Sequence, residues 1–189
     1  ELCGGGPSLG TLFWLGGSGQ RPDNELIRRF CNALHAEGVT LTVHALHHER
    51  GLRELPTRIE KTPGAVWLGG HSAGGGAAAT LIERVRVRGL VLINPCPPGQ
   101  RARVRSLTIF GENDGGGRFA CDNDALVHAS CCSPPGGADA VTLIARQGDH
   151  SIRYNPDDGD KDAHSASEKT RQMNLAVAKE VAAFLGASR

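Results

Sequence analysis

The stretch Leu68–Leu81, LGGHSAGGGAAATL, contains three consecutive glycines and raises the question of what they serve. Residues 64–68, GAVWL, form a short apolar run with β-branched and aromatic members, which is typical of a strand. Three alanines and TLIE follow the glycines, and these are good helix formers. A strand that turns through glycines directly into a helix is the architecture of a site, so we do not interpret the run as a flexible linker.

Residues 70–74, GHSAG, match the G-x-S-x-G pattern of a nucleophile elbow. The glycines are needed because a sharp strand-to-helix turn leaves no room for side chains beside a strained serine. A second match, residues 6–10, is expected to be a coincidence, because Ser8 has no strand before it and a strand instead of a helix after it. The sequence therefore predicts Ser72 as a nucleophile.

A phosphate-binding loop is the competing interpretation of so many glycines. No Lys-Ser or Lys-Thr pair follows them, so the lysine of a P-loop is missing. The glycines also fail to give G-x-G-x-x-G from the strand end with an acidic residue about twenty positions later. We expect no nucleotide site here.

The chain alternates short apolar runs with amphipathic ones, as in a parallel sheet covered on both faces. Strands are expected at 11–15, 39–46, 65–69, 90–94, 106–110 and 140–145. Helices are expected from an Asp23 cap to Gly38, from the glycine run to about Arg84, near 121–132 and near 167–185, with a weaker, proline-interrupted segment up to about 62. These patterns predict one α/β domain over residues 1–189, a three-layer α/β/α sandwich with a mostly parallel sheet of about six strands.

A serine hydroxyl is a weak nucleophile unless a base removes its proton and an acid orients that base. Asp114 lies four residues past one expected strand, and His150 lies just past the next. The order Ser72, Asp114, His150 is the order that a G-x-S-x-G elbow requires. The competing acids are Glu112, Asp122, Asp124 and Asp149, the last of which is expected to point away from the histidine beside it.

An oxyanion hole for acyl transfer needs backbone N–H donors. Ala73, at the start of the new helix, is the first candidate. Ser18, and after it Gly17, are the candidates in the loop that follows the first strand. His71 and Gly16 adjoin these groups and are the expected substrate-binding residues, all at the carboxyl ends of strands where parallel sheets collect their sites.

Composition excludes several other classes of function. The net charge of +1 gives no case for a nucleic-acid partner, and the alternating arginines of 84–88 and 101–105 are better explained as solvent-facing positions than as an anion-binding patch. No apolar run approaches the length of a membrane span and no cleavable signal pattern opens the chain, which favours a soluble protein. Oligomeric state and cellular location stay open.

The metal and disulfide patterns are weak. The six cysteines lack metal-ligand spacing. Cys121 and Cys131, if they share a helix, lie about 15 Å apart, whereas a disulfide needs less than about 7 Å, so we favour a helix with free thiols. His44, His47 and His48 lack an obvious further ligand. The aspartates at 158, 160 and 162 lack the Gly and Glu of a calcium loop. We therefore expect neither a metal nor another cofactor.

The phrases LGGHSAGG, VRGLVLINPCPP, LTIFGENDGGG and GDHSI resemble the α/β-hydrolase superfamily, most closely the compact, lidless group of dienelactone-hydrolase-like and NSL-complex-subunit-like hydrolases. HHERG (47–51) is similar to the Asp-x-Arg-Gly turn of that group, with Glu49 in place of Asp. The resemblance implies Ser72 as nucleophile, Asp114 as orienting acid and His150 as base. One departure is Gly16-Gly17 where many relatives have His-Gly, which leaves the second oxyanion donor open.

The implied activity is a serine hydrolase that cleaves small-molecule carboxylic esters with small or short-chain acyl groups. Only eleven residues separate Asn94 from Ser106, too few for a lid, which predicts an open, shallow pocket. Two alternatives remain open from the sequence. One is a thioesterase or amidase with the same triad, and the other is a catalytically silent interaction module.

Overall fold

The computed structural model describes residues 9–18, 25–37, 40–95, 103–112, 139–145, 148–154 and 163–186. Its centre is a six-stranded sheet in the order β2-β1-β3-β4-β5-β6, with every neighbouring pair parallel. The strands are β1 (Thr11–Gly16), β2 (Thr42–His47), β3 (Val66–His71), β4 (Gly89–Ile93), β5 (Arg105–Gly111) and β6 (Ala140–Ala145).

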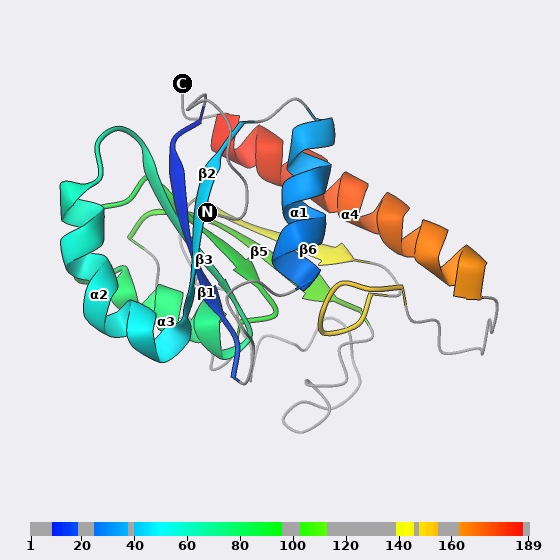
Figure 1. Ribbon diagram of the computed structural model, residues 1–189, viewed down its shortest axis with the longest axis horizontal. Helices are drawn as coiled ribbons and strands as arrows, with labels where there is room; N and C mark the ends of the chain where they lie inside the picture. Colours follow the sequence, from blue (N-terminus) through cyan, green and yellow to red (C-terminus); the bar gives the residue numbers. More distant parts are fainter. Residues whose placement is uncertain are drawn as a thin grey trace.

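Helices cover both faces of the sheet, which confirms the expected three-layer α/β/α class (Figure 1). Helices α1 (Glu25–Ala36) and α4 (Ala163–Gly186) pack on one face, and α2 (His48–Lys61) and α3 (Ala73–Leu81) on the other. Each face has its own buried apolar cluster. Strands that are apolar on both faces are therefore explained by two covering layers.

The α1 helix shows how periodicity predicts packing. The expected apolar face of Leu26, Ile27, Phe30 and Leu34 is buried against the sheet. The last helix agrees as well, although it begins earlier than expected, and Val177, Val181 and Phe184 are buried on its inner face while Met173 is partly buried.

The proline-interrupted segment is a complete helix, α2, with Pro56 inside it, so the expectation of a weak element was wrong. Its buried face consists of Gly51, Leu55 and Ile59, at helical spacing, and this packing outweighs the backbone hydrogen bond that a proline cannot make. A Cβ on Gly51 would lie 2.1 Å from Leu15 Cδ2, so the glycine lets α2 approach β1 closely.

The register brings the carboxyl ends of the strands together. Gly70 of β3 is paired with Leu15 of β1 and Leu92 of β4. His71 is paired with Ile93, which in turn is paired with Ile109 of β5. Residues that follow these strand ends are therefore gathered at one edge of the sheet, where sites form in parallel α/β folds.

Cys31 is buried in α1 and disulfide-bonded, with its partner cysteine outside the described residues. The free thiols expected from the sequence are those of Cys121 and Cys131, which lie outside the described residues, and no prediction was made for Cys31. The helix expected near 121–132 lies outside the described residues. In the part of the chain that the structure describes, no helix is long and apolar enough to span a bilayer.

Candidate functional site

The turn between β3 and α3 is a sharp elbow with Ser72 at its apex. Ser72 has φ 55° and ψ −126°, a conformation that L-residues rarely adopt. Its N–H donates to Ile93 O at 3.0 Å, and its carbonyl accepts the Gly76 N–H at 3.1 Å, which starts the helix. The side chain is half-buried. In a turn of this kind the serine Oγ points out from the carboxyl end of the sheet, where a substrate can reach it.

The glycines around Ser72 are explained by clearance. A Cβ on Gly70 would lie 2.4 Å from Gly74 O, so the turn closes on itself too tightly for a side chain. A Cβ on Gly74 would lie 2.1 Å from Leu15 O and 2.5 Å from Gly16 O. The start of α3 is therefore pressed directly against the end of β1. The glycine run is a packing requirement of the elbow.

His150 lies next to this elbow. Its ring packs against the ring of His71, with centroids 4.6 Å apart at 49°. His71 directly precedes Ser72 and is fully buried. His71 Nε2 lies 2.7 Å from the main-chain oxygen of His150. Because a carbonyl oxygen only accepts, Nε2 carries the proton of this hydrogen bond.

The loop around His150 is held by its own aspartate and by α1. Asp149 Oδ1 accepts the N–H groups of Ser151 and Arg153, both at 2.8 Å. Oδ1 of Asp149 is therefore engaged within its own loop. Arg29 donates from α1 to Ser151 O at 2.8 Å and to Ile152 O at 3.2 Å. Burial lowers the pKa of the Arg29 guanidinium, against the opposing effect of Glu25.

Backbone strain gathers in this region. Among the described residues other than glycine, positive φ occurs at Ser72 (55°), Asn94 (41°) and Ile152 (55°). Ile152 is β-branched and fully buried, so its conformation is unusual. Such strain costs roughly 1–3 kcal/mol per residue and persists only where the surroundings impose it, as at functional sites.

The other expected site residues fall as follows. Ala73 is the first residue of α3, and Gly16 ends β1 directly beside Gly74. Gly17 is buried and Ser18 is exposed, which favours Gly17 over Ser18 as the donor nearer the packed elbow. Asp114 lies outside the described residues, as do the competing acids Asp122 and Asp124. The third alternative, Glu112, is half-buried, and its N–H donates to Ala145 O at 3.0 Å.

Asn94 also belongs to this region, although it is not among the residues predicted from the sequence. Asn94 is 1 % exposed, follows β4, and donates through Nδ2 to His150 O at 2.8 Å. Its Oδ1 accepts the Gly111 N–H at 2.9 Å. An asparagine between an apolar strand and a proline was the available signal, because asparagine tolerates the left-handed conformation that ends a strand abruptly.

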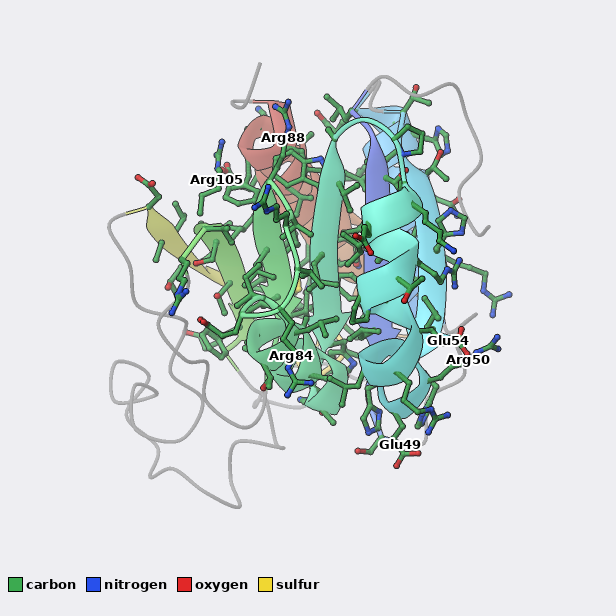
Figure 2. All side chains as sticks on the ribbon, turned by 90° about the vertical axis from the view of Figure 1, so that its left-hand side faces the viewer. Glu49, Arg50, Glu54, Arg84, Arg88 and Arg105 are labelled. Atoms are coloured by element: carbon green, nitrogen blue, oxygen red, sulfur yellow. The ribbon has the colours of Figure 1, made fainter. Side chains whose placement is uncertain are left out.

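The described arginines of the two runs are spread over both ends of the sheet, with Arg84 toward the end where Glu49 lies (Figure 2). Arg84, Arg86 and Arg88 are exposed and alternate with half-buried valines, as expected, although the run forms the turn before β4 and not a strand. Figure 2 shows Arg88 and Arg105 together at one end of the sheet and Glu49, in the first turn of α2, at the opposite end. The Asp-x-Arg-Gly-like segment is therefore the start of a helix near the candidate site.

The histidine cluster makes ring contacts. His44 stacks on Phe13 at 5.4 Å, and the rings of His47 and His48 lie 4.4 Å apart. Within the described ranges, no group of three or more His, Cys, Asp or Glu side chains is placed to hold a metal ion. A groove of about 860 Å³ runs between α1 and α4 and is lined in part by Tyr154, but Ser72 and His150 do not line it.

No protein-family model matches the chain, and no curated protein matches it by sequence. Solved structures do match. A protein from Xanthomonas campestris pv. campestris, described as a hydrolase of the alpha/beta superfamily, has a TM-score of 0.56 at 16% identity, covering 89% of this chain and 98% of its own. The pyrethroid hydrolase PytH has a TM-score of 0.62 at 11% identity, covering 94% and 98%.

The esterase domain of a Rhodothermus marinus protein has a TM-score of 0.56 at 11% identity, covering 94% of this chain and 88% of its own. At these identities the likeness concerns the fold. The chain therefore has the α/β-hydrolase fold, which confirms the resemblance at the level of architecture.

Proposed function

We propose that the protein is a serine hydrolase that cleaves small-molecule carboxylic esters through Ser72, His150 and Asp114. The observation that carries the proposal is the contact between two histidine rings at the elbow. It places the His150 loop beside the residue that precedes a strained Ser72. Fold neighbours that are described as hydrolases and esterases support the general class.

In the proposed reaction His150 takes the Ser72 hydroxyl proton while Oγ forms a bond to the ester carbonyl carbon. The tetrahedral oxyanion is stabilised by the N–H groups of Ala73 and of Gly17 or Ser18. Its collapse breaks the bond to the alcohol oxygen, which leaves with the proton from His150. Water then adds to the acyl carbon with His150 again as base, and the acid departs as Ser72 recovers its proton.

Asp114 is proposed as the group that orients His150. Support comes from the end of β5, where a Cβ on Gly111 would lie 2.3 Å from Asp149 O and 2.5 Å from Gly148 O. The β5 end is thus packed against the loop that carries His150, and Asp114 follows three residues after Gly111. This packing of the β5 end against the His150 loop is what supports Asp114 as the orienting acid.

The test is hydrolysis of p-nitrophenyl acetate, butyrate and octanoate by the wild type and Ser72→Ala. Ser167→Ala, which removes an exposed hydroxyl on α4, is the matched control. We expect turnover in the wild type and in the control, and loss of at least about a thousandfold in Ser72→Ala. The dependence of the rate on acyl length indicates how long an acyl group the pocket accepts.

Equal activity in all three proteins would show that another serine, or a contaminant, is responsible. A folded wild type without activity toward any of the esters would contradict the proposed function and favour the interaction module.

A further inference from the structure

We propose that Asn94 and His71 form a clamp on the main-chain carbonyl of His150, and that this clamp fixes the His150 imidazole relative to the Ser72 elbow. The inference rests on the proposed hydrolase function and adds two positioning residues to it. Neither residue is assigned to the chemical steps. Each acts through His150.

The clamp consists of two buried donors on one acceptor. Asn94 Nδ2 lies 2.8 Å and His71 Nε2 2.7 Å from His150 O. Asn94 is 1 % exposed and His71 0 % exposed. Two donors use both lone pairs of a carbonyl oxygen, so the carbonyl has a single orientation. The peptide plane at His150 is fixed as a result.

Asn94 also connects three parts of the sheet edge. It extends β4, its N–H donates to Ile109 O of β5 at 2.8 Å, and its Oδ1 accepts the N–H of Gly111. Gly111 is the last residue of β5, the strand that leads to Asp114. One side chain thus connects the candidate base to the end of the strand that precedes the candidate acid in the sequence. Its φ of 41° suits asparagine better than most residues.

The ring contact links the clamp to the candidate catalytic side chain of His150. Because the His71 and His150 rings pack at 4.6 Å, fixing the His150 carbonyl and the His71 ring together leaves the His150 ring little freedom. A displacement of about 1 Å in a catalytic group costs on the order of a hundredfold in rate. A different buried asparagine offers a comparison. Asn174 of α4, 3 % exposed, donates to the same loop at Ile152 O, 3.4 Å away, and not to the His150 carbonyl.

The variants separate positioning from stability. Asn94→Gly removes both side-chain hydrogen bonds and accepts the positive φ without strain. His71→Leu removes the second donor, and His71→Gln restores an N–H near the position of Nε2. Asn174→Ala is the control, since it removes a buried asparagine that holds the loop elsewhere. Circular dichroism at the assay temperature verifies that each variant is folded.

With p-nitrophenyl butyrate we expect Asn94→Gly and His71→Leu to lower kcat by about ten- to a hundredfold with KM within about twofold of the wild type. His71→Gln should recover most of the loss, and Asn174→Ala should melt earlier but keep the wild-type kcat. Wild-type kcat in folded Asn94→Gly, or equal loss in His71→Gln and His71→Leu, would overturn the clamp.

A second measurement is independent of ester hydrolysis. With ¹³C-labelled histidine, the nuclear Overhauser effect between the His71 and His150 rings should be strong in the wild type and Asn174→Ala, and lost in Asn94→Gly. Persistence of that effect in Asn94→Gly would overturn the clamp. If the wild type hydrolyses no ester, the proposed function is contradicted. The nuclear Overhauser measurement still tests whether the clamp exists, because it does not depend on activity.

Discussion

Gly74→Ala is expected to destabilise the protein because the elbow leaves no space for a methyl group. The added Cβ would lie 2.1 Å from Leu15 O, about 0.9 Å short of the 3.0 Å below which real Cβ contacts essentially do not occur. Gly16 O at 2.5 Å and the Leu15 carbonyl carbon at 2.5 Å close the same space. All three obstacles are backbone atoms, so no side-chain rotation relieves them.

The magnitude follows from two opposing effects. Overpacking costs about 1–3 kcal/mol, and an obstacle made of sheet backbone places this case at the upper end. Replacing glycine by alanine in a helix returns up to about 1 kcal/mol. The net loss in the free energy of unfolding is therefore about 2 kcal/mol, which lowers Tm by roughly 4–8 °C in a chain of this length. Displacement of α3 from β1 should also reduce any ester hydrolysis, because the Ala73 and Gly17 N–H groups move apart.

The assay is thermal unfolding followed by circular dichroism, with Gly186→Ala as the matched control. Gly186 ends α4, and an added Cβ there meets no atom within 4 Å. We expect the control to melt at or slightly above the wild-type temperature. An unchanged Tm in Gly74→Ala would refute the claim that β1 and α3 are packed too closely for any side chain at position 74.

Two further perturbations are expected to be measurable. Arg29→Met removes the two hydrogen bonds that the charged Arg29 side chain donates to the carbonyls of Ser151 and Ile152. The free energy of unfolding, measured by urea denaturation, should fall by about 1.5–3 kcal/mol. Arg28→Met, at an exposed neighbour, should change little, and equal effects of the two would contradict a stabilising role of the Arg29 hydrogen bonds. Reduction with dithiothreitol opens the Cys31 disulfide and should lower the free energy of unfolding by about 2–4 kcal/mol. Cys31→Ala should lose most of that response, and a Tm insensitive to reductant would contradict the bridge.

The sequence alone was sufficient for the architecture and for the elbow. Each expected strand is present, displaced by up to three residues at its ends, because burial on both faces leaves a continuous apolar run that is visible locally. The glycines around Ser72 were correctly attributed to clearance, since a strand that turns straight into a helix imposes that need within a few residues.

Local patterns failed where a contact elsewhere in the fold decides the outcome. Pro56 argued against a helix, but the Gly51, Leu55 and Ile59 face packs well enough to form α2. Cys31 is bridged, although its helical surroundings predict nothing about a partner distant in sequence. In the first case tertiary packing supplies a free energy that the local pattern does not contain, and in the second a covalent bond joins Cys31 to another part of the chain.

The candidate site divides in the same way. The sequence by itself predicted the strained turn at Ser72. It also indicated His150 as the candidate base by its place after a strand. Both predictions follow from local alternation and chain order. Only the tertiary structure showed that His71 and Asn94, 79 and 56 residues from His150, meet at its carbonyl. The physical reason is register. Which residues meet at the carboxyl edge depends on how β3, β4 and β5 align, and that alignment is set by packing of both faces and not by any one segment.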